Sequence, residues 1–467
     1  MSQEIYCADA TELAAKIRTK VLSPVEVMRA HLERIEAINP KINAVVTLAA
    51  DALEQAQKAE DALMRGEIRG PLHGVPFTAK DCFDSQGLRT TRGSLIFSDL
   101  VPAADATALR RLREGGGILL GKTNLPEFAL RAETSNKVFG RTLNPWNLER
   151  TAGGSSGGEA AAIAAGLSPL GIGTDLGGSN RLPSHYCGIV GFKPSHGRIP
   201  LTGSWPELMC RHMHVGPLAR TVRDAALALA LLAGPDNRDP YAVPPPMALP
   251  EEGDFAIQGL RVGYFQEGPF APVEREIQQV VGRAAASLQD MGCVVEAVEF
   301  DWRERLAIDV CMAMVVAEGE YYLRALVQGR EEELSASIQG LLGVPLPPLE
   351  DFLASLDKRE LLARDMAQFF QHYDLLLCPT APNTAHGHEA EKLLVDGQEA
   401  ALGPGHAANI TATFGLTGSP AISVPFATSR EGLPIGVQLV APHRDEATLL
   451  GAATALEQAG VQGRPEI

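Results

Sequence analysis

Short apolar segments alternate with helical patterns along most of the chain, and this alternation restricts the fold more than any other feature. Residues 75–80 and 118–123 are strand-like, and a helical pattern over 105–114 separates them. The same order returns at 261–265, before a helix and a further apolar segment. Strands that alternate with helices favour a parallel or mixed sheet. We therefore expect an α/β fold in which a large twisted mixed sheet lies between helices.

One domain over residues 1–467 is expected, with two segments that differ from the rest. Residues 1–65 are predicted to be helical, and Ser23 begins a capping box with Pro24 as the first helical residue. Residues 301–371 are also predicted to be helical, as an insertion near a substrate pocket. Their methionines and tyrosines could line that pocket, although such a stripe more often belongs to a core: Met312, Met314, Tyr321 and Tyr322.

Two serines set in glycine lie on either side of an alanine-rich helical pattern and a short apolar strand. Ser155 lies in the run 153–158, GGSSGG, and Ser179 follows the apolar segment 169–174 in a second glycine-rich turn. Glycine lets the backbone adopt positive φ and approach a ligand closely. Serines presented in this way are placed for chemistry rather than for packing.

A serine hydroxyl is a weak nucleophile and needs a base. Lys80 ends an apolar strand, where burial would lower its pKa and leave a neutral amine that can accept a proton. A relay follows, in which Lys80 takes a proton from Ser155 and Ser155 takes one from Ser179. Taken alone, a lysine after a strand is usually a solvated strand end, and a glycine-serine run is usually a turn. The prediction of catalysis therefore depends on the lysine and both serines occurring together.

These residues, in this order, resemble the amidase signature family. Residues 153–198 resemble its signature, and the segments 70–81, 119–130 and 416–426 resemble further blocks of the family in the expected order. The resemblance implies an amidohydrolase that uses no cofactor and no metal. It also implies a small-molecule amide or carbamate as substrate, and a homodimer.

The resemblance assigns a role to each residue of the site. Ser179 would be the nucleophile, Ser155 the bridging serine that follows a cis peptide bond, and Lys80 the base. Asp175 and Arg181 would orient the nucleophile loop. Four backbone amides would form the oxyanion hole, those of Leu176, Gly177, Gly178 and Ser179.

The expected reaction is hydrolysis of a carboxylic amide through an acyl-enzyme. The family also contains carbamate and ester hydrolases, and these stay open as alternatives. A further alternative is the glutaminase subunit of a tRNA-dependent amidotransferase. That subunit usually has a Ser-Leu-Asp-Gln-type sequence where this chain has RHMHVGP at 211–217, so a free-standing amidase is favoured.

Two rival motifs point to other chemistry. Residues 154–158 match the G-x-S-x-G nucleophile elbow, in which His386, His388 or His406 would be the base. That five-residue pattern leaves Lys80 unexplained. The glycines between 171 and 177 resemble a dinucleotide-binding loop, but no glycine-opened helix follows them.

A metal site is also a weak interpretation. Cys210, His212 and His214 alternate, so on a strand they would share one face, yet no fourth ligand is evident. A half-buried strand or loop is the better prediction for these residues.

The charge of the chain restricts its partners. A net charge of −16 disfavours nucleic acid and anionic membranes, because both require basic patches. The first residues lack the basic and apolar regions of a secretion signal, and the seven cysteines are scattered without a CxxC pair. These features favour a cytoplasmic protein.

Overall fold

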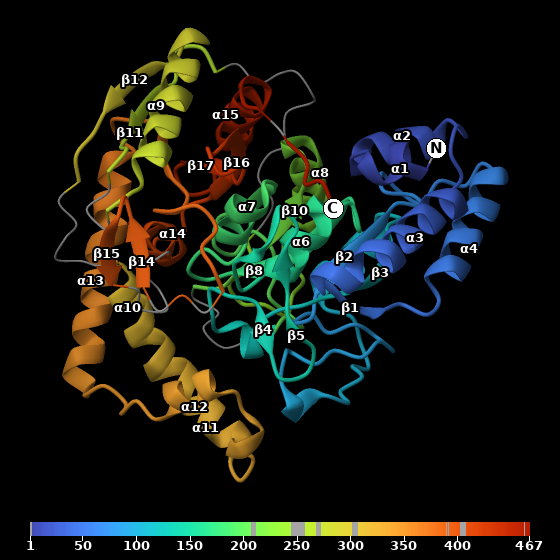
Figure 1. The fold of residues 1–467 in the computed structure, drawn as a ribbon, viewed down its shortest axis with the longest axis horizontal. Coiled ribbons are helices and arrows are strands. Elements are labelled where there is room, and N and C mark those ends of the chain that lie inside the picture. The colour runs from blue at the N-terminus through green and yellow to red at the C-terminus, as the bar shows by residue number, and fades with distance from the viewer. Residues whose placement is uncertain are drawn as a thin grey trace.

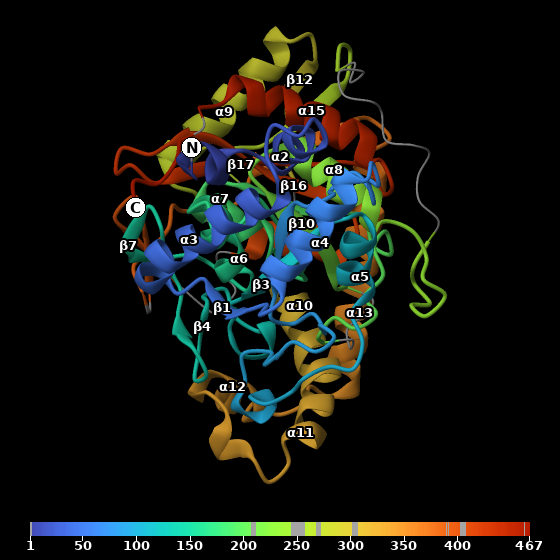
Figure 2. The ribbon, with the colours of Figure 1, turned by 90° about the vertical axis from the view of Figure 1, so that its right-hand side faces the viewer.

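The computed structural model describes residues 2–206, 212–243, 257–267, 272–300, 307–388, 390, 392–401, 408–461 and 463–467. Its centre is a mixed sheet of 11 strands with helices on both faces (Figures 1 and 2). The predicted α/β fold is confirmed. The strands follow one another across the sheet in the order β1 (Val45–Leu48), β3 (Ile118–Thr123), β2 (Pro76–Lys80), β8 (Leu170–Asp175), β10 (His214–Ala219), β9 (Val190–Lys193), β16 (Ala421–Thr428), β17 (Pro434–Val440), β13 (Leu375–Pro379), β11 (Arg261–Tyr264) and β12 (Val294–Ala297).

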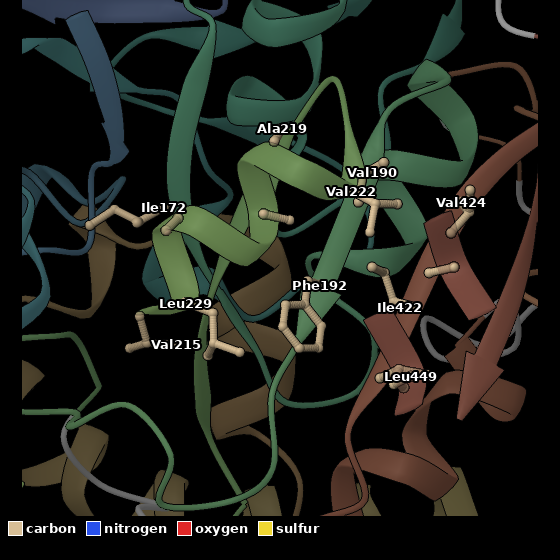
Figure 3. Close-up of a cluster of buried hydrophobic side chains, with 14 of the residues drawn as sticks. Ile172, Val190, Phe192, Val215, Ala219, Val222, Leu229, Ile422, Val424 and Leu449 are labelled. Carbon is tan, nitrogen blue, oxygen red and sulfur yellow. The ribbon is translucent and has the colours of Figure 1, made fainter. Parts of the chain in front are cut away.

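One face of the sheet is covered by helices that carry its largest apolar cluster. Val222 and Leu229 of α8 (Val222–Leu232) and Leu449 of α15 (Glu446–Ala459) lie over the apolar side chains of four central strands (Figure 3). Burying one such side chain contributes about 1.5–3 kcal/mol. The strand residues of this cluster include Ile172, Val190, Phe192, Val215, Ile422 and Val424.

On β8, the residues on either side of Ile172 have no side chain, and this lets other groups approach the strand closely. A Cβ on Gly171 would collide with the carboxylate of Glu159, which lies on α6 (Gly157–Ala164). A Cβ on Gly173 would lie 2.8 Å from Ser156 Oγ. The two glycines therefore allow the start of α6 to pack directly on the strand that leads to Ser179.

The N-terminal segment is helical with one exception. It contains α1 (Ser2–Cys7), α2 (Ala10–Arg18), α3 (Pro24–Ile42) and α4 (Ala52–Met64), and Ser23 caps α3 in the predicted capping box. The prediction that residues 1–65 are entirely helical is wrong at β1, which pairs antiparallel with β3 at the edge of the sheet. This strand has four residues, of which only the first is buried, so its sequence carries no clear alternation.

Residues 307–369 form a helical arm at one end of the molecule (Figures 1 and 2). A π-helical turn, Val315–Glu320, joins its first two helices. Ser335 caps the third helix, and its backbone N–H also donates to the buried carboxylate of Glu127 at 2.7 Å. The helices are α10 (Ala307–Met314), α11 (Tyr321–Val327), α12 (Ala336–Leu342) and α13 (Leu349–Phe369).

The other helices are α5 (Thr107–Glu114), α7 (Arg181–Cys187), α9 (Arg275–Asp290) and α14 (Asn409–Leu416). No helix within the described residues is both long and apolar enough to cross a bilayer.

Candidate active site

Ser179 lies in the turn that joins the end of β8 to α7. The carboxylate of Asp175 shapes this turn, because it accepts hydrogen bonds from the backbone N–H of Gly178 at 2.8 Å and of Asn180 at 3.1 Å. Gly178 has φ +120°, and a Cβ there would collide with Thr411. Only glycine fits this position, as the glycine-rich sequence indicates.

A buried ion pair fixes the carboxylate that shapes the turn. Arg181 Nε lies 3.0 Å from Asp175 Oδ2 and its Nη2 lies 2.8 Å from Oδ1, and neither side chain is exposed. Burial opposes ionisation of this carboxyl, but Arg181 outweighs it and holds the pKa of Asp175 below its ordinary value. Arg181 Nη1 also donates to Gln438 Oε1 at 2.7 Å, which ties the turn to β17.

Asp175→Asn is expected to lower the free energy of unfolding by about 3–5 kcal/mol, because it leaves the buried charge of Arg181 without a partner. Urea denaturation followed by circular dichroism measures this change. The matched control is Glu54→Gln, which breaks an exposed pair with Lys58 and should cost less than about 1 kcal/mol. An equally small loss for Asp175→Asn would contradict the structural role of the pair.

Ser155 lies beside this turn, just before α6. The Gly154–Ser155 peptide bond is cis, as the resemblance implies. The backbone N–H of Ser156 donates to the carbonyl oxygen of Ser179 at 3.1 Å, so the two glycine-serine turns are in direct contact. Serines 24 positions apart in the sequence are thus brought together.

Lys80 lies at the end of β2 and is fully buried. Its Nζ donates to Ser155 Oγ at 2.7 Å and to Thr174 Oγ1 at 2.9 Å. Burial lowers the pKa of Lys80 to about 8, against the opposing effects of Cys82, Asp175 and Glu159. An appreciable fraction of neutral amine is therefore present near pH 7 to 8, as a proton acceptor requires.

A buried carboxylate joins the elements that carry Lys80 and Ser155. Glu159, in the first turn of α6, accepts hydrogen bonds from the hydroxyl of Thr78 on β2 and from Thr123 Oγ1 on β3, the second at 2.7 Å. Burial raises the pKa of Glu159 to about 7. Glu159 therefore fixes α6 to the two strands beside Lys80.

A cavity of about 440 Å³ opens beside Ser179. The helical arm supplies one wall through Met312, Ile338 and neighbouring residues, and the body of the protein supplies the other. Most lining side chains are apolar. The lining residues are Ala129, Leu130, Arg131, Ala132, Gly154, Leu176, Gly177, Gly178, Ser179, Leu182, Cys311, Met312, Val315, Ala336, Ser337, Ile338, Gly340, Leu341, Val344 and Ala408.

Comparison with known proteins identifies the group to which this fold and site belong. A family model described as Amidase matches residues 26–450. The chain belongs to the amidase signature family. An acylamidase of Rhodococcus erythropolis is 34% identical to it, over 97% of this chain and 96% of that protein. Together with the solved structures below, these matches show that the protein is an amide-hydrolysing enzyme.

Amidotransferase subunits are as similar to this chain in sequence as the acylamidase is, and solved structures of both kinds of protein share its fold. A glutamyl-tRNA(Gln) amidotransferase subunit of Moorella thermoacetica is 36% identical, over 99% of both chains. The crystal structure of a bacterial aryl acylamidase of the same family is 31% identical, with a TM-score of 0.90, and covers 98% of this chain and 97% of that chain. The structure of the corresponding amidotransferase subunit from Thermotoga maritima is 26% identical, with a TM-score of 0.77, and covers 100% of this chain and 97% of that chain.

The rival bases and the metal site find no support in the structure of this amidase. His386 Nδ1 and His388 Nε2 each lie 2.9 Å from a backbone carbonyl oxygen, and neither residue lines the cavity. His406 and Cys210 lie outside the described residues. Within the described part of the chain, no group of three or more His, Cys, Asp or Glu side chains could hold a metal ion.

The two methionines and two tyrosines of the arm, which could line a pocket or belong to a core, have different environments. Met312 lines the cavity, whereas Met314 is buried in the core. Tyr321 is exposed, and the ring centroid of Tyr322 lies 5.9 Å from that of Trp205. One of the four therefore lines the cavity and one is buried in the core, while the two tyrosines are exposed, so neither expectation holds for the whole set.

Three residues of the site were missing from the sequence interpretation. Thr174 holds Lys80, Glu159 joins α6 to the sheet, and Arg131 lines the cavity. Of these three residues, only Glu159 could have been found from the sequence, because it is the one acidic residue in an otherwise apolar helix.

Proposed function

We propose that this enzyme hydrolyses a carboxylic amide through an acyl-enzyme on Ser179, with Ser155 and Lys80 as the proton relay. The observation that carries the proposal is the 2.7 Å contact between Lys80 Nζ and Ser155 Oγ in a buried site, beside the turn of Ser179. A lysine with a lowered pKa next to a serine is the arrangement that serine activation requires.

In the acylation step, Ser179 Oγ attacks the carbonyl carbon of the substrate. The proton of Ser179 passes to Ser155 as the proton of Ser155 passes to Lys80 Nζ. When the tetrahedral intermediate collapses, the C–N bond breaks and the relay returns a proton to the leaving nitrogen. In deacylation the same relay takes a proton from a water molecule, whose oxygen attacks the ester carbon. The bond between this carbon and Ser179 Oγ then breaks, the relay returns the proton to Ser179, and the acid is released. Each positioned proton transfer contributes about 10²- to 10⁴-fold in rate.

Backbone N–H groups of the turn would stabilise the oxyanion. The Gly178 N–H donates to Asp175 at 2.8 Å, so we assign this role to the amides of Leu176, Gly177 and Ser179. Leu176, Gly177 and Ser179 all line the cavity in which the substrate would lie. One such donor contributes about 3 kcal/mol to stabilisation of the transition state.

We infer a free-standing hydrolase rather than a glutaminase subunit. Glutamine carries both an ammonium and a carboxylate, and an uncompensated charge is costly to bury in an apolar site. Within the described lining there is no acidic side chain to receive the ammonium. A carbamate or ester would use the same relay, and a panel of such substrates decides between them.

The purified chain alone is expected to release ammonia from hexanamide and benzamide with kcat/KM about 100-fold above that for glutamine, because no acidic side chain in the described lining can pair with the ammonium of glutamine. A coupled ammonia assay measures all three reactions, and a parallel binding assay with tRNA is expected to show no complex. Efficient glutamine turnover that requires partner subunits, together with tRNA association, would support the amidotransferase role instead.

A further inference from the structure

Arg131 is the one side chain with a formal charge among the described residues that line the cavity. It is exposed, and within the described structure no carboxylate pairs with its guanidinium. Two buried arginines of the described structure, by contrast, are ion-paired, Arg181 with Asp175 and Arg198 with Glu446. What distinguishes Arg131 from the other exposed arginines is its place in the lining of this cavity. Its guanidinium is therefore available to an anionic ligand.

The backbone of Arg131 lies directly against the serine turns. A Cβ on Gly154 would lie 2.7 Å from the carbonyl oxygen of Arg131. Gly154 precedes the bridging Ser155, and both Gly154 and Ser179 line the same cavity. Arg131 therefore lines the same cavity as Ser179 with an exposed side chain, and a substrate molecule in that cavity can contact both residues.

The segment that carries Arg131 is held in a defined conformation. Phe128 and Ala129 have φ angles of 56° and 62°, a region that residues other than glycine rarely adopt. The ring of Phe128 packs against Trp205, with 5.8 Å between the ring centroids. Arg92 lies over the same Trp205 ring at 4.5 Å. A fixed backbone at this segment limits the entropy lost on binding to that of the Arg131 side chain.

We propose that the preferred substrates are amides with an apolar body and a carboxylate at the end remote from the scissile bond, and that Arg131 binds this carboxylate. The inference rests on the proposed amide hydrolysis and adds a substrate class to it. The guanidinium presents two parallel N–H donors that match a carboxylate. The apolar walls would receive the intervening carbons. Outside this position, the acidic protein offers an anionic substrate little attraction.

The test compares two substrates that differ only at the remote end, hexanamide and the monoamide of adipic acid. Benzamide and 4-carbamoylbenzoate form a matched aryl pair, and monoamides of shorter and longer diacids establish the best length. The measured quantity is the ratio of kcat/KM for the carboxylated substrate to that for the neutral one. Arg131→Gln is expected to lower this ratio at least tenfold at the best length, and Arg131→Lys should retain part of it.

The control is Arg18→Gln, which changes the net charge equally at an exposed arginine at the end of α2 and should leave the ratio unchanged. Raising the salt concentration should lower the ratio for the unmodified enzyme. An unchanged ratio in Arg131→Gln, with hexanamide still hydrolysed, would overturn the carboxylate site and leave the amidase proposal standing. Absence of hydrolysis with every amide would overturn both.

Discussion

Ser179→Ala is expected to reduce amide hydrolysis by about 10⁴-fold or more, because it removes the oxygen that forms the proposed acyl-enzyme. The free energy of unfolding should change by less than about 1 kcal/mol. The turn should keep its conformation without this hydroxyl. The Asp175 carboxylate accepts hydrogen bonds from two backbone N–H groups of the turn, and Thr411 Oγ1 donates to the Gly177 carbonyl oxygen at 2.6 Å. Ammonia release measures the activity, and urea denaturation measures the stability.

A covalent label separates loss of the nucleophile from loss of the site. A fluorophosphonate should modify the unaltered enzyme at Ser179, as peptide mass spectrometry would show, and Ser179→Ala should stay unlabelled. The matched control is Ser287→Ala on α9, which should keep both activity and label. Retained hydrolysis in Ser179→Ala, or a label on another serine, would remove Ser179 from the role of nucleophile.

The fold was predictable where burial gives a segment a clear pattern. β2, β3 and β8 are buried along their whole length, so their apolar runs stand out from the helical patterns around them. β1 has no such signal, because it is short and only its first residue is buried at the edge of the sheet. Its position depends on pairing with β3, which the local sequence does not encode.

The site was predictable where chemistry restricts the residue type. Glycine at 178 is required by a positive φ and by contact with Thr411, and this requirement leaves a visible motif around Ser179. Arg131 has no such restriction. Its significance comes from the cavity it lines and from the lack of a carboxylate partner within the described residues, and both are properties of the tertiary structure.

Lys80 gives the second large expected effect. Lys80→Ala should lower kcat/KM by about 10²- to 10⁴-fold, because the proposed serine relay would lose its proton acceptor. His386→Ala and His388→Ala should have little effect, since these histidines lie outside the cavity lining. A larger loss in either histidine variant than in Lys80→Ala would favour a histidine base instead.

The pH profile tests the same role in the unaltered enzyme. Burial lowers the pKa of Lys80 to about 8. Below this pH the amine is protonated and cannot accept a proton, so kcat/KM should fall roughly tenfold for each unit of pH. Above it, kcat/KM should reach a plateau. The limb near pH 8 should disappear in the residual activity of Lys80→Ala, because the titrating group is gone. Persistence of that limb in the variant would assign it to another group and exclude Lys80 as the base.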